Sequence, residues 1–573
     1  MNFLSKEEFP ILQPSHKIDH HNYFQETIVS IYFQLQRTHE FTKIQKLYKQ
    51  VVDVLNLLIC KQNDKSFFRY VNLLYRMIGQ TRNVVHGKGE HSMTYLLILA
   101  FYSYNPTYSL FALHRLVYPL APDNNVFGNW RDLPYFCDFV KQHTSDEHPL
   151  IFYAIELLNN QLYKDYLLNQ FSKSPTSYLQ ISNVCKWIPR EHKKFDWLFE
   201  KLALNWAKLH KPYLFDNLDT HIQFIKVSNK MKKIYRKVCS QLNKKIQTLE
   251  IDLCNKKYEN IIPRQVGLQS TIKYYNLFLQ EDEEDFNKHK DKMKLIEKFD
   301  TFFDDLFDKS TFTHFIHDFQ KVNHISLFHF VKHAIDANKT NNLNKIYFLN
   351  KLWDKSSPLI PHFQKDFFLP VVDVSLSMKK ENSECFYHSL GLALLLSKNS
   401  IIENRIIAMD SNPTWVVFEP NMPFTKRVQH FLNEIETCQN TTPNYLNVID
   451  LISYTCLETR MSRYFTRELQ IVFFSVFHSF DSTFFSNFNS LFSKFEKTPK
   501  ITFWNTSNNG LDNFPIITDN NRFIYMSGYN SSILKEFIKI NKIIINKPTN
   551  AYEFIEKICS NSVYDVLSQY LTT

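Results

Sequence analysis

The chain has 573 residues, of which 44% are apolar and 22% charged, a composition typical of globular proteins and not of disordered ones. This length predicts roughly three or four domains of average size, or two large ones. The net charge of +10 favours anionic partners, nucleic acid first and a membrane surface second. The count of 8 glycines argues against a glycine-rich phosphate-binding architecture.

The cysteines and the apolar runs indicate the cellular setting. The nine cysteines are odd in number and scattered without a CxxC pair, so the sequence supports neither a disulfide framework nor a zinc ribbon, and reduced, intracellular thiols are the simplest interpretation. The N-terminal residues do not have the pattern of a signal peptide. The longest apolar runs, such as 95–102, are far shorter than the ~20 residues needed to span a bilayer. We therefore expect a soluble, cytoplasmic protein with no membrane insertion.

Residues 24–345 predict helices almost throughout, because apolar residues recur there at three- and four-residue steps. Many short helices with short connections, and no clean repeat period, favour a stacked helical array over a closed bundle. An acidic run at 281–286 predicts a solvated loop, with an interaction tail as the alternative. The clearest helical patterns lie at 41–60, 66–78, 91–103, 107–119, 148–171, 195–209, 218–249 and 325–337.

From about residue 365 the pattern changes to short strands that alternate with helices. The strands are rich in β-branched and aromatic residues and are apolar on both faces, which predicts a doubly wound, mainly parallel sheet. The expected fold class is therefore multidomain, α followed by α/β. The predicted parts are an N-terminal extension at 1–23, a helical-repeat array at 24–345, a linker at 346–364 and an α/β domain at 365–573.

The first strand of this α/β domain ends in the sequence VVDVSLSM, residues 371–378. Asp373, Ser375 and Ser377 follow its apolar run directly, and ligands of such sheets bind at the carboxyl ends of the strands. One interpretation is an ordinary strand end with turn residues. The other is a set of oxygen ligands for a small hard cation such as Mg²⁺.

Residues 226–245 contain eight Lys or Arg and no acid. On a helix, five of the lysines share one face, next to an apolar face that would pack on the array. A stripe of lysines can follow a phosphate backbone, and the alternative is a solvated lysine face in a lysine-rich protein. The stripe consists of Lys226, Lys230, Lys233, Lys237 and Lys244, and the apolar face of Val227, Met231, Ile234, Val238 and Leu242.

The sequence contains no recognisable catalytic motif. There is no Walker motif, no GxSxG and no HExxH, and the 22 histidines are scattered. Cys385 and His388 lie on the helix predicted after the first strand, and we interpret them as core or surface residues. We therefore expect that the protein is not an enzyme.

Several motifs follow one another in an order that is typical of one family. They are HGKGEHSMTYLLILAF (86–101), GNWRDLP (128–134), KWIPREHKKFDWLFEKLA (186–203), VVDVSLSM (371–378), FWN (503–505) and MSGYN (526–530). Together they resemble the domain-of-unknown-function 2828 family of plants, fungi and large DNA viruses. The resemblance implies a helical region similar to the TROVE module of Ro ribonucleoproteins, followed by a von Willebrand A-like domain. With the AT-rich residue usage, it makes a large DNA virus a reasonable source.

In von Willebrand A domains the DxSxS pattern belongs to a metal-ion-dependent adhesion site. The resemblance implies that the three polar residues of the strand end act with a threonine from a second loop, for which Thr442 is the best match and Thr441 the alternative. The family has a further Asp after the fourth strand, and this sequence has Val476 there. Mg²⁺ is therefore expected to bind weakly or not at all.

Three basic residues of the family motifs are further candidates for RNA contacts. Lys88, Arg131 and Arg190 lie at predicted loop–helix junctions, where phosphate contacts often fall. The alternative is a structural role for these motifs, with their tryptophans packed between helices.

The resulting expectation is a non-catalytic, Ro-like RNA-binding protein. Its helical array would bind non-coding or structured RNA through basic faces, and its α/β domain would bind protein partners. The alternative is a structural or scaffold protein of a virion or large assembly, acting only through protein contacts. The expected location is the cytoplasm, or the host cytoplasm or virion if the protein is viral.

Overall fold

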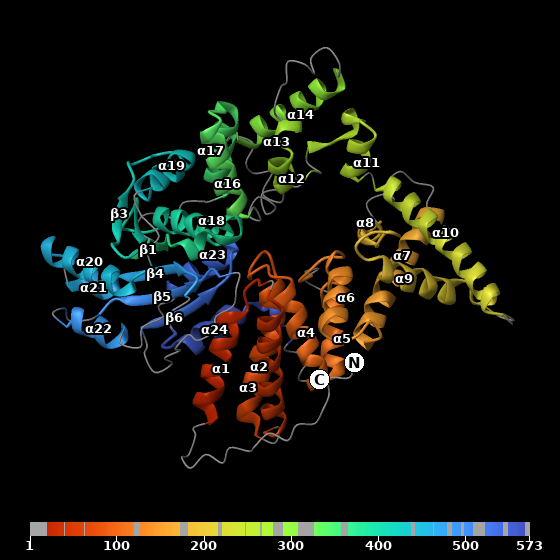
Figure 1. Ribbon diagram of the computed structural model, residues 1–573, viewed down its shortest axis with the longest axis horizontal. Coiled ribbons are helices and arrows are strands. Elements are labelled where there is room, and N and C mark those ends of the chain that lie inside the picture. The colour runs from red at the N-terminus through yellow and green to blue at the C-terminus, as the bar shows by residue number, and fades with distance from the viewer. Residues whose placement is uncertain are drawn as a thin grey trace.

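A computed structural model gives the arrangement of most of the chain (Figure 1). The residues that it describes are 20–38, 40–61, 64–119, 126–171, 181–215, 220–246, 248–263, 266, 268–278, 290–307, 326–356, 365–436, 442–461, 463–477, 484–493, 495, 498–507, 522–542, 548–565 and 567. The acidic run at 281–286 lies outside these ranges.

The described part of the region before residue 357 is helical, as the periodicity predicts. The segment expected to be a helix at 41–60 is α2 (Phe41–Ile59), and its apolar face is buried. The other helices of this region are α1 (His20–Gln34), α3 (Lys65–Arg82), α4 (Ser92–Tyr104), α5 (Pro106–Arg115), α6 (Asp132–His143), α7 (Pro149–Phe171), α8 (Val184–Trp187), α9 (Asp196–His210), α10 (His221–Lys245), α11 (Leu249–Cys254), α12 (Leu268–Lys273), α13 (Tyr275–Phe278), α14 (Lys290–Phe307), α16 (Leu327–Lys339) and α17 (Leu343–Ser356).

The region from residue 365 contains a mixed sheet in the order β3-β2-β1-β4-β5-β6, in which β2 and β3 are antiparallel and the other pairs are parallel. The strands are β1 (Phe368–Asp373), β2 (Arg405–Met409), β3 (Thr414–Val417), β4 (Gln470–Ser475), β5 (Lys500–Asn505) and β6 (Phe523–Ser527). The helices are α18 (Leu376–Lys398), α19 (Phe424–Glu434), α20 (Tyr445–Glu458), α21 (Arg463–Glu468), α22 (Phe484–Leu491), α23 (Ser531–Asn541) and α24 (Ala551–Cys559).

Helices cover both faces of this sheet. On one face, Phe537 of α23 packs against Phe368 of β1 and Trp504 of β5. On the other, Tyr445 of α20 and a phenylalanine of α22 pack against aromatic residues of β4 and β5. Strands β1 and β4 are buried along their whole length because they are covered on both sides, which explains their continuous apolar sequences.

The first part of the predicted linker at 346–364 is helical. Helix α17 runs through residue 356, because Phe348, Leu349, Leu352 and Trp353 recur at helical spacing and are buried. The Trp353 ring stacks on an aromatic residue of α19 with ring centres 3.9 Å apart. Helices α16 and α17 therefore pack against α18 and α19 of the α/β region rather than joining two separate bodies.

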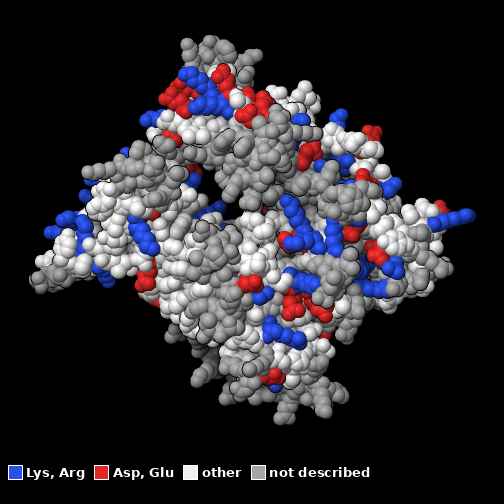
Figure 2. Space-filling view, turned by 180° about the vertical axis from the view of Figure 1, so that it is seen from behind, with Lys and Arg blue, Asp and Glu red and all other residues white. Residues whose placement is uncertain are grey.

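The first helix of the chain lies against the last strand. Helix α1 packs on β6 and α24, and the ring of Phe33 contacts that of Tyr525 at 5.6 Å. The helices from α1 to α17 thus lead away from the sheet and return to it (Figure 1). Figure 2 shows an opening near the middle of the molecule. Among the described helices, none has the length and apolar character that a membrane crossing requires.

Candidate nucleic-acid interface and the strand-end site

Helix α10 carries the predicted lysine stripe. Its first turn is fixed by a capping box, in which the Thr220 side chain and the Gln223 backbone, and the Gln223 side chain and the Thr220 backbone, bond reciprocally. Its buried side packs on α7, α8 and α9. The residues buried there are Met231, Tyr235, Val238 and Leu242. Tyr235 was not among the residues predicted for this face, and two residues that were, Val227 and Ile234, are only half-buried.

All five lysines of the stripe are exposed, on the side of α10 away from its buried face. Two neighbouring cations of the same helix are ion-paired, Lys232 with Glu200 and Arg236 with Glu191. Among the described residues, no carboxylate pairs with any lysine of the stripe. Figure 2 shows Lys and Arg side chains at the edge of the molecule that α10 forms. The stripe therefore presents ammonium groups that no carboxylate of the described residues neutralises.

Arg131 and Arg190 lie around the same tryptophan. The Arg131 guanidinium is 5.5 Å from the centre of the Trp187 ring, and Arg190 lines a pocket of about 350 Å³ of which Trp187 forms another wall. Asn243 of α10 also lines this pocket, so the pocket adjoins the C-terminal end of the lysine stripe. Both arginines are exposed. The structure therefore brings these two predicted residues close to the stripe.

Lys88 is not available to RNA, which corrects its assignment. Its side chain is 2% exposed, and its Nζ donates to the carbonyl oxygens of Tyr32 and Leu35 and to the Ser527 hydroxyl at 2.6 to 3.1 Å. Burial lowers the pKa of Lys88 to about 7, against the raising effects of Cys559 and Glu90. The loop–helix junction faces the sheet and not solvent, so Lys88 joins α1 to the end of β6.

The motifs GKGEHS, FWN and MSGYN meet at this junction. The Asn530 side chain donates to the carbonyls of Val84 and Gly87 at 2.6 and 3.0 Å, and the Asn505 side chain donates to the Phe33 carbonyl at 3.1 Å. Gly87 is required, because a Cβ there would lie 1.8 Å from a backbone oxygen. The sequence does not show that these motifs meet, because Asn530 and its two acceptors are 446 and 443 positions apart.

The motif GNWRDLP has a structural role as well. Asp132 accepts two hydrogen bonds from Arg82 at 2.8 and 3.0 Å and further contacts from His91 and Tyr95, and both members of the ion pair are buried. Burial alone would raise the pKa of Asp132, but the Arg82 and His91 charges bring it well below its usual range. At Gly128 a Cβ would clash with this carboxylate. Sequence analysis missed this buried pair.

At the strand-end site, Asp373 is fully buried between β1 and β4. Its Oδ1 accepts from the Ser375 backbone N–H at 2.9 Å, and its Oδ2 accepts from the Ser475 hydroxyl at 2.6 Å. Tyr445 contacts the same hydroxyl at 2.8 Å, and burial and then the Asp373 charge raise the pKa of Tyr445 well above its usual range. Both carboxylate oxygens of Asp373 therefore accept hydrogen bonds from neighbouring residues of the protein.

The remaining predicted ligands do not complete a magnesium site. The hydroxyls of Ser375 and Ser377 bond one another at 2.7 Å, at the point where α18 begins with Leu376. Thr442 is exposed ahead of α20, Thr441 lies outside the described residues, and Val476 is buried. Mg²⁺ requires about six oxygens in near-octahedral geometry. One hydrogen-bonded carboxylate and a pair of mutually bonded hydroxyls do not fit that requirement.

The part of the chain that the structure describes contains no group of three His, Cys, Asp or Glu residues able to hold a metal ion.

The family model described as Domain of unknown function (DUF7788) matches residues 368–561, from β1 through α24. No curated protein matches the sequence. The similarity found thus covers the α/β region and carries no assigned activity.

Proposed function

We propose that the protein binds RNA without catalysing a reaction, and that the lysine stripe of α10 is the main contact surface. The observation that carries this proposal is the exposed stripe itself, since its five lysines lack carboxylate partners among the described residues while Lys232 and Arg236 on the same helix are paired. A lysine that contacts a phosphate releases a counterion, so each free ammonium adds salt-dependent affinity.

Arg131 and Arg190 extend the proposed surface beyond the end of α10. Because Trp187 lies within cation–π distance of Arg131, the cluster combines positive charge with an aromatic face, which suits an unpaired base next to a phosphate. Lys186 in the same pocket is paired with Glu250 and contributes less charge. We expect the arginines to favour single-stranded over fully paired RNA.

The finer family assignment is part of the same proposal. A series of helices that leads away from the sheet and returns to it supports a TROVE-like array, and a sheet in which Asp373 lies where the strand order reverses supports a von Willebrand A-like domain. In this proposal the α/β domain docks on the array and binds protein partners, its adhesion site being degenerate. The proposed location is the cytoplasm.

The decisive experiment measures RNA binding as a function of salt with a fluorescent single-stranded RNA and a hairpin of the same length. Replacing Lys230, Lys233 and Lys237 by Gln should weaken binding and make the slope of log K against log salt shallower by roughly 0.7 for each phosphate that the variant no longer neutralises. The matched control replaces three exposed lysines of other helices and loops. These are Lys208, Lys257 and Lys426.

The outcomes separate RNA binding from a scaffold role. Loss of affinity in the α10 variant but not in the control supports the stripe. If the wild-type protein binds neither RNA with a salt-dependent affinity, the proposal is wrong. Stoichiometric protein partners that are retained after the three α10 substitutions would instead favour a structural or scaffold protein of a virion or large assembly.

A further inference from the structure

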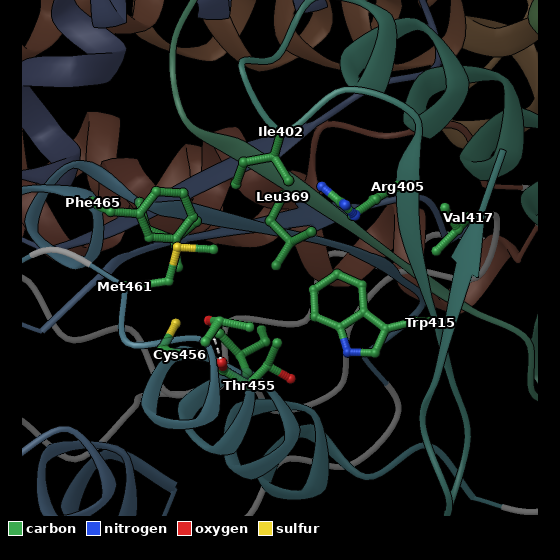
Figure 3. A pocket seen from close by; sticks show the side chains of 12 residues that line it. Leu369, Ile402, Arg405, Trp415, Val417, Thr455, Cys456, Met461 and Phe465 are labelled. Atoms are coloured by element: carbon green, nitrogen blue, oxygen red, sulfur yellow. Dashed lines mark hydrogen bonds between the residues drawn. The ribbon is translucent and has the colours of Figure 1, made fainter. Parts of the chain in front are cut away.

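A cavity of about 250 Å³ lies between the sheet and the helices α20 and α21 (Figure 3). Its walls are mainly apolar and include Leu369 of β1 and Phe465 of α21. Val417 and Met461, which also line it, are 52% and 41% exposed and give the cavity an apolar rim. It is larger than a cavity of roughly 150 Å³ that suffices to hold benzene in a protein core. The space thus fits an apolar group of several carbons.

Most polar groups of the lining are already satisfied. The Thr455 hydroxyl donates to the Leu451 carbonyl at 2.7 Å, and the Thr459 hydroxyl donates to the Thr455 carbonyl at 2.6 Å. Burial raises the pKa of the Cys456 thiol to about 11, so this thiol remains neutral. These three side chains therefore contribute surface and no charge to the cavity.

Arg405 and Trp415 differ from these polar residues of the lining, because their side-chain donors have no partner among the described residues. Among the residues that the structure describes, neither the Arg405 guanidinium nor the Trp415 indole N–H has a hydrogen-bond or ion-pair partner. Figure 3 shows the Arg405 side chain extending from its strand toward the cavity, beside the Trp415 ring. Arg405 is a cation without an ion-pair partner among the described residues, so the complementary group is one that accepts hydrogen bonds and is negatively charged, as a carboxylate is.

We propose that this cavity binds a free apolar monocarboxylic acid, whose chain fills the apolar space and whose carboxylate pairs with the exposed Arg405 guanidinium. The site lies on the face of the sheet that carries α20, apart from the lysine stripe on α10. The proposal does not depend on RNA binding.

The test titrates the full-length protein with octanoate, hexanoate and octan-1-ol by isothermal titration calorimetry. Octanoate should bind about tenfold more tightly than hexanoate, because two more methylene groups are buried. It should bind at least about threefold more tightly than octan-1-ol, because the alcohol lacks the charge that pairs with the exposed Arg405.

Three variants locate the site. Arg405→Gln should weaken octanoate about threefold or more and leave octan-1-ol unchanged. Cys456→Met fills the cavity and should weaken both ligands, while circular dichroism checks that the fold is retained. Arg467→Gln is the matched control, because it removes the same charge from the neighbouring helix α21 outside the lining, and it should change neither affinity.

Equal binding of octanoate and octan-1-ol would overturn the proposal, as would an octanoate affinity that Arg405→Gln leaves unchanged. Octanoate binding that survives Cys456→Met in a folded protein would place the ligand elsewhere and would also overturn it. A short peptide ending in leucine tests a protein terminus as the occupant. Binding of that peptide without binding of octanoate would contradict a free acid.

Discussion

The role of Lys88 depends on its surroundings in the folded protein, which the sequence alone does not show. A lysine between two glycines at a predicted loop–helix junction looks like a phosphate contact. In the structure its ammonium group lies in the interior, held by two carbonyl oxygens and a hydroxyl from opposite ends of the chain. Its burial makes it a determinant of stability, and its pKa of about 7 makes that contribution depend on pH.

The pH dependence follows from the direction of this shift. The pKa of lysine is about 10.4 in the unfolded chain. Between that value and the folded-state pKa of about 7, the unfolded chain binds more protons, so Lys88 makes the protein more stable as the pH rises. Relative to Lys88→Met, wild type should gain up to about 1.4 kcal/mol per pH unit in this range. Urea unfolding at neutral pH and at about pH 9 measures the difference. In the exposed control Lys426→Met, no such trend should appear.

Asp132 gives a second prediction at this scale. Asp132→Asn removes the charge that compensates the buried Arg82, and an uncompensated buried charge costs about 3 to 5 kcal/mol. Thermal and urea unfolding should show a loss of this size. Asp138→Asn on the same helix is the control, because Asp138 is only half-buried and accepts its hydrogen bond from the neutral side chain of Gln142. A small effect of Asp132→Asn would mean that the buried pair does not stabilise the fold as described.

At the scale of elements, α10 is anchored unevenly. The residues buried along it lie from Met231 onward, so its first turns depend on the capping box of Thr220 and Gln223. Thr220→Ala should cost about 1 kcal/mol and increase amide exchange in the first two turns, where Lys226 lies, but not near Leu242. Hydrogen exchange with mass spectrometry measures both. Thr248→Ala is the matched control, because Thr248 precedes α11 without a side-chain capping bond. Unchanged exchange in the Thr220 variant would show that tertiary contacts hold the first turns.

The strand elements were more predictable than the segments between them. Continuous apolar runs predicted the buried strands, such as β1 and β4, because a strand covered on both faces leaves little choice of residue type. The start of α18 and the extent of α17 were not predicted. The extent of α17 depends on burial of Trp353 against another helix, which is a tertiary contact.

At the scale of the whole molecule, polar contacts between segments far apart in the sequence hold the first described helices against the sheet. Asn505 and Asn530 donate from the sheet to carbonyls of Phe33, Val84 and Gly87. Each acceptor left unsatisfied in the interior costs about 1 to 3 kcal/mol. Closure therefore depends on a few polar contacts in addition to the apolar packing of α1 on β6.

The double variant Asn505→Ala with Asn530→Ser tests this closure, because serine retains the N-terminal cap of α23 but cannot reach the two carbonyls. Amide exchange should increase in α1 and residues 84–91, and the radius of gyration measured by X-ray scattering should increase, while α10 is unaffected. Asn433→Ser, on the exposed side of α19, is the control. Normal exchange in α1 would show that packing alone keeps the chain closed.

The sequence by itself determined the elements and their order, because apolar periodicity and burial on one or both faces act locally along the chain. It also determined the lysine stripe of α10, which needs only helical geometry to share one face. Only the tertiary structure decided which polar residues are accessible. It buried Lys88, paired Lys232 and Arg236, and gave Asp373 a hydroxyl partner, since these outcomes depend on residues up to 439 positions apart.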